Sequence, residues 1–500
     1  MRVLLMAMPD VAPRLFSRRL KMPSLALVSL AGNCPGHEVW LADLNTRRPR
    51  IRQAVLRLLA RYRPQVVALS AMSFQYSTAY HIARLVKETD SAVRTMLGGY
   101  HATLLADELA AGEDGKVFDF LVRGEGEAVL HKTLDALEER RPLDTVLGLS
   151  WKDERGTWRH NPRAPILDLA DIRLPDRSRR VYHNYGYAGY GFEVVETSRG
   201  CFMQCKFCSM HHMYGRTFRA FRLDRVIADL EDVRARGGRM VLFADDNITL
   251  DPDRLAALCE AIARARLNRI RYLVQASSAG LARRPDLAPA MARAGVDMVF
   301  LGIENVSRRN LEAIGKGDIV EYTRKAVRAL HQAEIIVIGG MIVGMEDDTA
   351  DDVYANFDFF RELEIDWLGD QILQPYPKTQ LREEWFAKDL ITNPDDYRRY
   401  DGYWANVRTR HLSSNDLQFH RWRAKTRYEC LERPKALTLR KHPIYGRIQN
   451  YLIYPAQYLR HRLRGLLRSE RDLYQREMRL DARLNRFSGL SDGPMPIAYD

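Results

Sequence analysis

Short apolar runs alternate with amphipathic helical segments along most of the 500 residues of this chain. Five such runs fall within residues 1–150, and six fall within residues 187–420. Continuously apolar runs are typical of strands that are covered on both faces, as in parallel sheets. The pattern therefore predicts an α/β chain, with a doubly wound parallel sheet over residues 1–150 and a partial (β/α)6 barrel over residues 187–420.

The predicted elements follow from these runs and from the patterns between them. Strands are expected at residues 3–8, 38–41, 65–72, 93–97, 118–122, 193–197, 240–244, 272–275, 298–302, 335–338 with 341–343, and 367–373. The clearest helices are expected at 51–62, 78–87, 223–236, 254–265 and 322–333, with another that ends near 138. Residues 151–186 contain several prolines and are expected to form a linker, residues 421–487 a helical basic region, and residues 488–500 a mobile tail.

Composition excludes several classes of protein. Hydrophobic residues make up 46% of the chain and charged residues 28%, which excludes long-range disorder. Six cysteines are too few for a secreted disulfide scaffold. The chain has no apolar run of about eighteen residues, and its first residues do not form a signal peptide. We therefore expect a protein of the reducing cytoplasm.

The net charge of +13 is concentrated near the C-terminus. Residues 421–487 contain 18 Lys and Arg against 6 Asp and Glu, so the rest of the chain is almost neutral. A general nucleic-acid binder would be basic throughout, so we expect no nucleic-acid partner. Two interpretations of the basic region remain open: a solvated helical face, or peripheral contact with an anionic membrane surface or partner.

Three of the six cysteines stand close together. Cys201, Cys205 and Cys208 have the spacing Cys-x3-Cys-x2-Cys and follow a predicted strand. In a reducing compartment such thiols indicate metal ligands. Zinc would need a fourth ligand, for which His211 and His212 are available. Three thiolates instead suit a four-iron cluster with one open iron.

The cysteine loop, with Phe207 before its third cysteine, resembles the signature of the radical S-adenosylmethionine (SAM) superfamily. The resemblance extends over about residues 190–420. It implies that the three cysteines hold a [4Fe-4S] cluster, that SAM binds the open iron, and that SAM is cleaved to a 5′-deoxyadenosyl radical. Later strand ends also resemble family motifs. The residues expected to bind the cluster or SAM are Phe207, Asp245, Asp246, Gln275, Glu304 and Gly344.

A doubly wound, Rossmann-like domain before the barrel resembles the cobalamin-binding domain of one radical SAM subgroup. Ligands of such sheets bind at the carboxyl ends of the strands. The residues expected there are Ser70, Ser73, Gly98, Gly99, His101 and Glu125. The loop at residues 8–14 contains no histidine, so we expect no protein ligand from it on cobalt. His101 is expected to contact the cofactor tail or to be buried; a nucleotide-binding or purely structural sheet is the alternative.

With both cofactors, the resemblance implies methylation of an unactivated carbon by methylcobalamin. Segments 370–380 and 401–409 resemble the subgroup of hopanoid methylases and the anaerobic magnesium-protoporphyrin ester cyclase. We therefore expect a C-methyltransferase of a hydrophobic polycyclic lipid, with hopanoid C-3 methylation as the specific reaction. A reductase, flavodoxin or ferredoxin would donate the electron. No catalytic side chain is assigned; Tyr376 and Tyr403 are either pocket or packing residues.

Three other functions remain open. An oxidative cyclase of a porphyrin ester would use the same cofactors. A tRNA methylthiotransferase would need three further cysteines near the start, where only Cys34 is found. A non-catalytic cobalamin-binding sensor would have no use for the three-cysteine loop.

Overall fold

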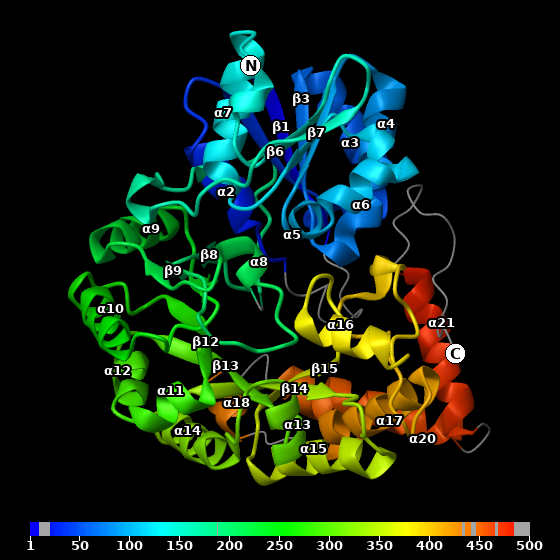
Figure 1. The fold of residues 1–500 in the computed structure, drawn as a ribbon. Helices are drawn as coiled ribbons and strands as arrows, with labels where there is room; N and C mark the ends of the chain where they lie inside the picture. The colour runs from blue at the N-terminus through cyan, green and yellow to red at the C-terminus, as the bar shows by residue number, and fades with distance from the viewer. Residues whose placement is uncertain (10–20, 188, 433–435, 442–446, 466–468, 485–500) are drawn as a thin grey trace.

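A seven-stranded sheet forms the N-terminal part of the computed structural model, which describes residues 1–9, 21–187, 189–432, 436–441, 447–465 and 469–484 (Figure 1). In sheet order its strands are β2 (Glu38–Asp43), β1 (Arg2–Ala7), β3 (Val66–Ser70), β4 (Arg94–Gly98), β5 (Phe120–Val122), β6 (Leu149–Lys152) and β7 (Trp158–His160). The first five pair in parallel. Their 2-1-3-4-5 order confirms the doubly wound prediction and places the switch point between β1 and β3.

Helices cover both faces of this sheet, which explains why its strands are continuously apolar. One face packs on α3 (Ile51–Tyr62), α4 (Tyr76–Thr89) and α6 (Ala106–Ala111). The other face packs on α2 (Leu25–Gly32) and α7 (Gly126–Glu138). The short helix α5 (Tyr100–Leu104) follows β4.

The sheet extends further along the chain than the sequence pattern suggested. β6 pairs antiparallel with β5, and β7 pairs antiparallel with β6. The stretch 151–186, expected to be an irregular linker, thus begins inside a hairpin of the first sheet. The hairpin turn is held by the side chain of Asp153, which accepts backbone hydrogen bonds from Arg155 and Thr157.

Six parallel strands form the second sheet, in simple chain order. They are β8 (Phe192–Val195), β11 (Met240–Phe243), β12 (Arg271–Ser277), β13 (Val296–Glu304), β14 (Ile336–Val343) and β15 (Trp367–Ile372). This confirms the partial barrel. Its outer helices are α9 (Leu223–Ala235), α10 (Pro252–Arg264), α11 (Ser278–Arg283), α12 (Leu287–Arg293), α13 (Arg308–Ala313), α14 (Val320–Gln332) and α15 (Ala350–Glu362).

Two further short strands and a helix frame the cysteine loop. β9 (Ser198–Arg199) pairs antiparallel with β10 (Arg219–Ala220), and α8 (His211–Tyr214) lies between them in the chain. In Figure 1 the first sheet lies above the open barrel, with α5 facing α8. The carboxyl end of β4 in the first sheet thus faces the cysteine loop at the carboxyl end of β8.

Helices complete the C-terminal part: α16 (Gln380–Ala387), α17 (Ser414–Arg427), α18 (Ala436–Lys441), α20 (Tyr454–Gly465) and α21 (Glu470–Leu484). π-helical turns cover Tyr428–Glu432 and Ile448–Ile453. The helical character predicted for this region is confirmed. The expected mobile tail, 488–500, and most of the loop at 8–14 lie outside the described residues.

Candidate functional site

The cysteine loop spans residues 200–218 and is closed at its base by the pairing of β9 with β10. It begins with Gly200, whose φ is +86°. A Cβ atom there would lie 2.3 Å from the carbonyl oxygen of Thr217. The left-handed backbone and this close approach explain why glycine directly precedes the first cysteine.

The three thiols form a donor set without disulfides. Cys201 is buried, Cys205 and Cys208 are half-buried, and the backbone N–H of Cys208 donates to the carbonyl of Cys205 at 3.1 Å. Burial raises the pKa of each thiol, that of Cys208 to about 11. Metal binding must therefore displace protons from this loop. Three free thiols on one short loop fit an iron–sulfur cluster with an open iron.

Asp245 and Gln275 lie beside this loop and hold its base. The carboxylate of Asp245 accepts hydrogen bonds from the Thr197 backbone N–H at 3.0 Å, from its hydroxyl at 2.6 Å, and from the hydroxyl of Ser198. Gln275 Nε2 donates to the Asp245 carbonyl at 3.2 Å. These contacts give both residues a structural role at the end of β11.

Asp246 contacts the first residue of the loop. Its Oδ2 accepts a hydrogen bond from Gly200 N–H at 2.9 Å. Burial raises its pKa to about 6. Phe207 packs partly buried on the barrel core, so its ring anchors the loop between the second and third cysteines.

Glu304 and Gly344 lie at the ends of β13 and β14, as predicted. Glu304 has a φ of +64°, and its carboxylate forms an ion pair with Lys316 at 2.8 Å. Burial opposes the Lys316 charge, but Glu304 and the Cys205 thiol raise the pKa of Lys316 overall. Gly344 has a φ of +87°, and a Cβ atom there would lie 2.6 Å from Leu417 Cδ2.

In the first domain, the structure brings the ends of β3 and β4 together. Ser70 ends β3, and Ser73 is buried three residues later. Gly98 ends β4 and is followed by Gly99, whose φ is +91°. A Cβ atom on Gly99 would lie 2.7 Å from the Ala71 carbonyl oxygen.

His101 is buried between two tyrosine rings. Its ring stacks on Tyr76 with centroids 4.0 Å apart, and meets Tyr397 of the second domain edge-on at 5.4 Å. Burial lowers its pKa to about 3, so the imidazole is neutral, and its Nδ1 has no hydrogen-bond partner. A neutral, unpaired nitrogen suits a contact to a polar group of a bound cofactor.

Glu125 has a different environment from the one expected of a cofactor contact. Its carboxylate accepts hydrogen bonds from Arg199 at 2.9 Å, from Arg219 at 3.1 Å and from the Leu167 N–H at 3.0 Å. The side chain is only 3% exposed. Glu125 therefore joins the two domains at the base of the cysteine loop.

Sequence reasoning missed Tyr100 and Tyr214. Burial raises the pKa of Tyr100 well above its usual value, and Tyr214, Asp246 and Cys208 add to the effect because they lie near its hydroxyl. Tyr100 was flanked by two predicted site residues, Gly99 and His101, so its position was a usable signal. No sequence signal marked Tyr214.

Tyr376 and Tyr403, which the sequence left as either pocket or packing residues, have different surroundings. Burial raises the pKa of Tyr376, and the charges of Asp401 and Cys208 contribute. Its ring lies beside that of Tyr400, with centroids 6.3 Å apart. Tyr403 donates a hydrogen bond to Asp481 on α21 at 3.2 Å, and its ring packs on Trp404. Tyr403 is therefore a packing residue.

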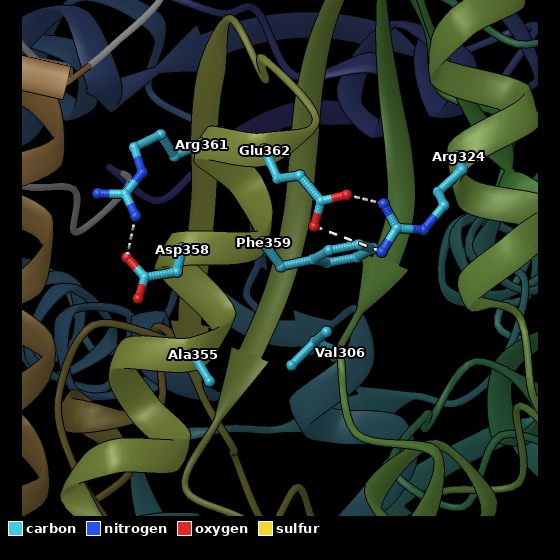
Figure 2. Close-up of a pocket in the computed structure, with 7 residues that line it drawn as sticks. All are labelled: Val306, Arg324, Ala355, Asp358, Phe359, Arg361 and Glu362. Carbon is cyan, nitrogen blue, oxygen red and sulfur yellow. Dashed lines mark hydrogen bonds and ion pairs between the residues drawn. The ribbon is translucent and has the colours of Figure 1, made fainter.

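A hollow of about 470 Å³ lies between α14 and α15. Figure 2 shows the residues that line it. Two ion pairs border it, Arg324 with Glu362 and Arg361 with Asp358. The charged residues lie on the outer helices α14 and α15, and none of the residues that line the hollow is among the site residues described above, so the hollow does not belong to the site.

A second group of potential metal ligands lies in the first domain. His37 Nε2 is 3.0 Å from one oxygen of Asp135, and His131 Nε2 is 3.6 Å from the other. The amino group of Met1 also contacts His37 at 3.0 Å. Both ring nitrogens of His37 have hydrogen-bond partners, whereas Nδ1 of His131 is buried with no hydrogen-bond partner among the described residues.

Comparison with known proteins agrees with this geometry. The sequence-family model of the radical SAM superfamily matches residues 195–360, and the sequence-family model of the B12 binding domain matches residues 13–133. An uncharacterized methyltransferase of Pyrococcus horikoshii is 31% identical over 365 residues, which are 73% of this chain and 78% of the relative. The chain belongs to the radical SAM superfamily.

Other relatives of this radical SAM protein carry more specific names. A hopanoid C-3 methylase of Methylococcus capsulatus is 27% identical, with 78% of this chain and 73% of the relative covered. An anaerobic magnesium-protoporphyrin IX monomethyl ester cyclase of Cereibacter sphaeroides is 25% identical, with 72% and 59% covered.

Solved structures show the same fold. The cobalamin-dependent SAM radical enzyme OxsB superposes with a TM-score of 0.67 at 17% identity, covering 90% of this chain and 72% of that one. The two domain types expected from the sequence, a cobalamin-binding domain and a radical SAM domain, are confirmed. The cofactors expected from the sequence are a [4Fe-4S] cluster, SAM and cobalamin. They are the cofactors of radical SAM enzymes that also carry a B12 binding domain, and this protein is such an enzyme. The sensor alternative is not supported.

Proposed function

We propose that the protein is a cobalamin-dependent radical SAM C-methyltransferase of a hydrophobic polycyclic lipid, and that its reaction is hopanoid C-3 methylation. The observation that carries the methyl-transfer proposal is the placement of the two strand-end regions. Tyr100, next to the cobalamin-side residues Gly99 and His101, lies on α5, which packs against α8 of the cysteine loop. The charges of Cys208 in that loop and of Asp246 after β11 add to the rise in the Tyr100 pKa. One cavity between the domains would then serve both cofactors.

The chain's own residues would hold the cofactors in this arrangement. Cys201, Cys205 and Cys208 would bind the cluster, with Asp246 and Glu304 near its SAM side. Gly99 and His101 would contact cobalamin. Together the cofactors would supply hydrogen abstraction and a methyl group, while the protein orients the substrate and excludes water. A reductase, flavodoxin or ferredoxin is the proposed electron donor.

The proposed lipid substrate is supported by the similarity to hopanoid C-3 methylase. The similarity to the magnesium-protoporphyrin ester cyclase favours a second candidate, oxidative cyclisation of a porphyrin ester. Both substrates are large, apolar and polycyclic, so the proposed cavity would suit either one.

Peripheral membrane contact is also part of the proposal. Within the described residues, no helix has the length and apolar character needed to cross a bilayer. The C-terminal region does expose a set of large apolar side chains, which we call the C-terminal apolar face: Ile448, Tyr451, Leu452, Leu459 and Leu463. Basic side chains beside such a face favour an anionic lipid surface.

The test is anaerobic incubation of the reconstituted, cobalamin-loaded enzyme with methyl-labelled SAM and a total lipid extract. A labelled hopanoid is the expected product. SAM cleavage without any labelled lipid would contradict lipid methylation, and a mass change of an added porphyrin ester would then identify the cyclase.

A further inference from the structure

The cysteine loop begins and ends at a pair of arginines. Arg199 in β9 and Arg219 in β10 stand directly opposite each other in the antiparallel pairing. Like charges in this position destabilise a strand pair. The closed base of the loop therefore needs a group that neutralises both guanidinium groups.

That group comes from the first domain. Glu125, just before α7, accepts hydrogen bonds from Arg199 Nη1 at 2.9 Å and from both terminal nitrogens of Arg219 at 3.1 Å. Its side chain is nearly inaccessible to water, so these charge-assisted bonds are weakly screened. A single carboxylate thus bridges the two strands that close the loop.

Arg199 is fixed by two further carboxylates. Its Nη2 donates to Glu127 at 2.6 Å and to Glu196 at 2.6 Å. Glu127 also accepts a hydrogen bond from the hydroxyl of Ser29 at 2.7 Å. Although burial opposes ionisation, the charge of Arg199 holds the pKa of Glu127 below its usual range. The network therefore joins helices α2 and α7 of one domain to the loop of the other.

We propose that Glu125 is a positioning residue: from the cobalamin-binding domain, it holds the cysteine loop closed through Arg199 and Arg219. The proposal rests on the assignment of the three cysteines as cluster ligands. Arg199 is separated from Cys201 only by Gly200, so a displacement of β9 from β10 moves the backbone that carries the first thiol. Loss of the Glu125 charge removes the carboxylate that pairs with the half-buried Arg219, whereas Arg199 keeps Glu127 and Glu196. Arg219 then faces Arg199 across the strand pair without its counter-charge, which weakens the pairing. The cluster site keeps its shape only while the first domain is docked.

The experiment compares Glu125→Gln with Glu139→Gln in the cluster-reconstituted, cobalamin-loaded enzyme. Glu139 is an exposed carboxylate of the same domain whose partner is Arg141, outside the network. The readout is the rate at which a ferrous-iron chelator removes the reduced cluster, followed by absorbance. Removal is expected to be about tenfold faster in Glu125→Gln, since partners behind metal ligands contribute that much or more to metal affinity. Glu139→Gln is expected to match the wild-type enzyme.

A double variant separates positioning from general loss of structure. In Glu125→Gln/Arg219→Gln only one cation remains at the base of the loop, so removal of the cluster is expected to be slower than in Glu125→Gln alone. If Glu125→Gln does not fold, Glu125→Asp replaces it, because this variant keeps the charge but has a shorter side chain. Its rate of cluster removal is then compared with that of Glu139→Gln. Equal rates in the Glu125 and Glu139 variants would overturn the proposal. A wild-type enzyme that binds no cluster would instead refute the ligand assignment.

Discussion

At the scale of single residues, the surroundings of a cysteine separate a ligand from a packing residue. Cys259 lies on α10 within the barrel core, among apolar side chains. The three thiols of the loop lie instead at the carboxyl end of β8, near Asp246 and Lys316. The same residue type therefore has two roles in this chain, and each role can be tested by substitution.

Alanine at Cys201, Cys205 or Cys208 is expected to abolish SAM cleavage, because two thiolates cannot hold the cluster with one open iron. Cys259→Ala is the matched control, and it should lose only some stability through a small core cavity. The measurements are iron per chain and 5′-deoxyadenosine formed after anaerobic reconstitution. Retained cleavage in any of the three loop variants would refute the ligand assignment.

Asp401 gives a prediction about pH. Burial raises its pKa to about 7 from an ordinary value of 3.8. The folded state therefore binds this proton more tightly than the unfolded chain, so the contribution of Asp401 to stability is lost as pH rises from about 4 to about 7. Asp401→Asn cannot ionise, and at pH 8 it is expected to be more stable than wild type by about 1–2 kcal/mol.

Thermal unfolding of the apoprotein between pH 5.5 and 8 measures this effect. The difference in Tm between the variant and wild type should grow with pH up to about 7, the pKa of Asp401 in the folded state, and then level off. A constant difference would show that the Asp401 carboxyl group does not titrate there.

At the scale of elements, the strand ends of the first sheet depend on close backbone contact. Gly99 and Gly124 both have positive φ, +91° and +80°. A Cβ atom on Gly99 would lie 2.7 Å from the Ala71 carbonyl oxygen, whereas one on Gly124 would have no neighbour within 4 Å. Substitution of Gly99 therefore tests steric contact together with backbone strain, whereas substitution of Gly124 tests backbone strain alone.

Gly99→Ala is expected to push the ends of β3 and β4 apart and to weaken cobalamin binding by about tenfold or more, since displacement of a binding loop removes several contacts at once. Gly124→Ala should cost only backbone strain, about 1 kcal/mol, with binding retained. Equilibrium dialysis with hydroxocobalamin measures the binding, and Tm measures the strain. Equal loss of binding in both variants would contradict the proposed cobalamin site.

The elements that the sequence predicted well are those with local causes. All eleven apolar runs became strands. Strands such as β1 and β8 are buried along nearly their whole length, and burial on both faces requires continuous apolarity. β14 was expected in two pieces but is continuous. Its glycines, Gly339 and Gly340, make room for the rings of Phe360 and Phe300, and this packing is not visible in the local pattern.

Elements with distant causes were harder to predict. The hairpin of β6 and β7 is short. β6 is held by pairing with β5, and β7 by pairing with β6, rather than by their own sequence pattern. Glu125 was expected to contact a cofactor because it follows a strand end between two glycines. Its partner Arg199 stands 74 positions later in the chain, and only the docked domains bring the two together.

At the scale of the whole molecule, the basic C-terminal region has two parts with different surroundings. In α21, Leu473, Tyr474 and Met478 are buried against Trp422 and Trp404. In the C-terminal apolar face, Tyr451 is 63% exposed and Leu452 67%. Both parts mix leucine, tyrosine and arginine, so composition alone could not separate packing on the protein from contact with a partner.

The exposed part leads to the membrane prediction. A variant with Leu452→Ser, Leu459→Ser and Leu463→Ser is expected to bind vesicles that contain phosphatidylglycerol about tenfold or more less tightly than wild type, because insertion of apolar side chains adds to the attraction of the basic region for anionic lipid. Cosedimentation measures the bound fraction at low ionic strength. Cluster content should be unchanged, because none of these leucines lies near the cysteine loop.

The matched control removes three leucines that are exposed elsewhere: Leu147, Leu174 and Leu480. This triple serine variant should bind the vesicles as wild type does, since it keeps both the apolar face and the basic charge. Salt should weaken the binding of all three proteins, because the attraction to anionic lipid is screened. If the two variants bind the vesicles equally well, the C-terminal apolar face does not insert into the lipid surface. A protein partner would then be the alternative explanation for its exposed side chains.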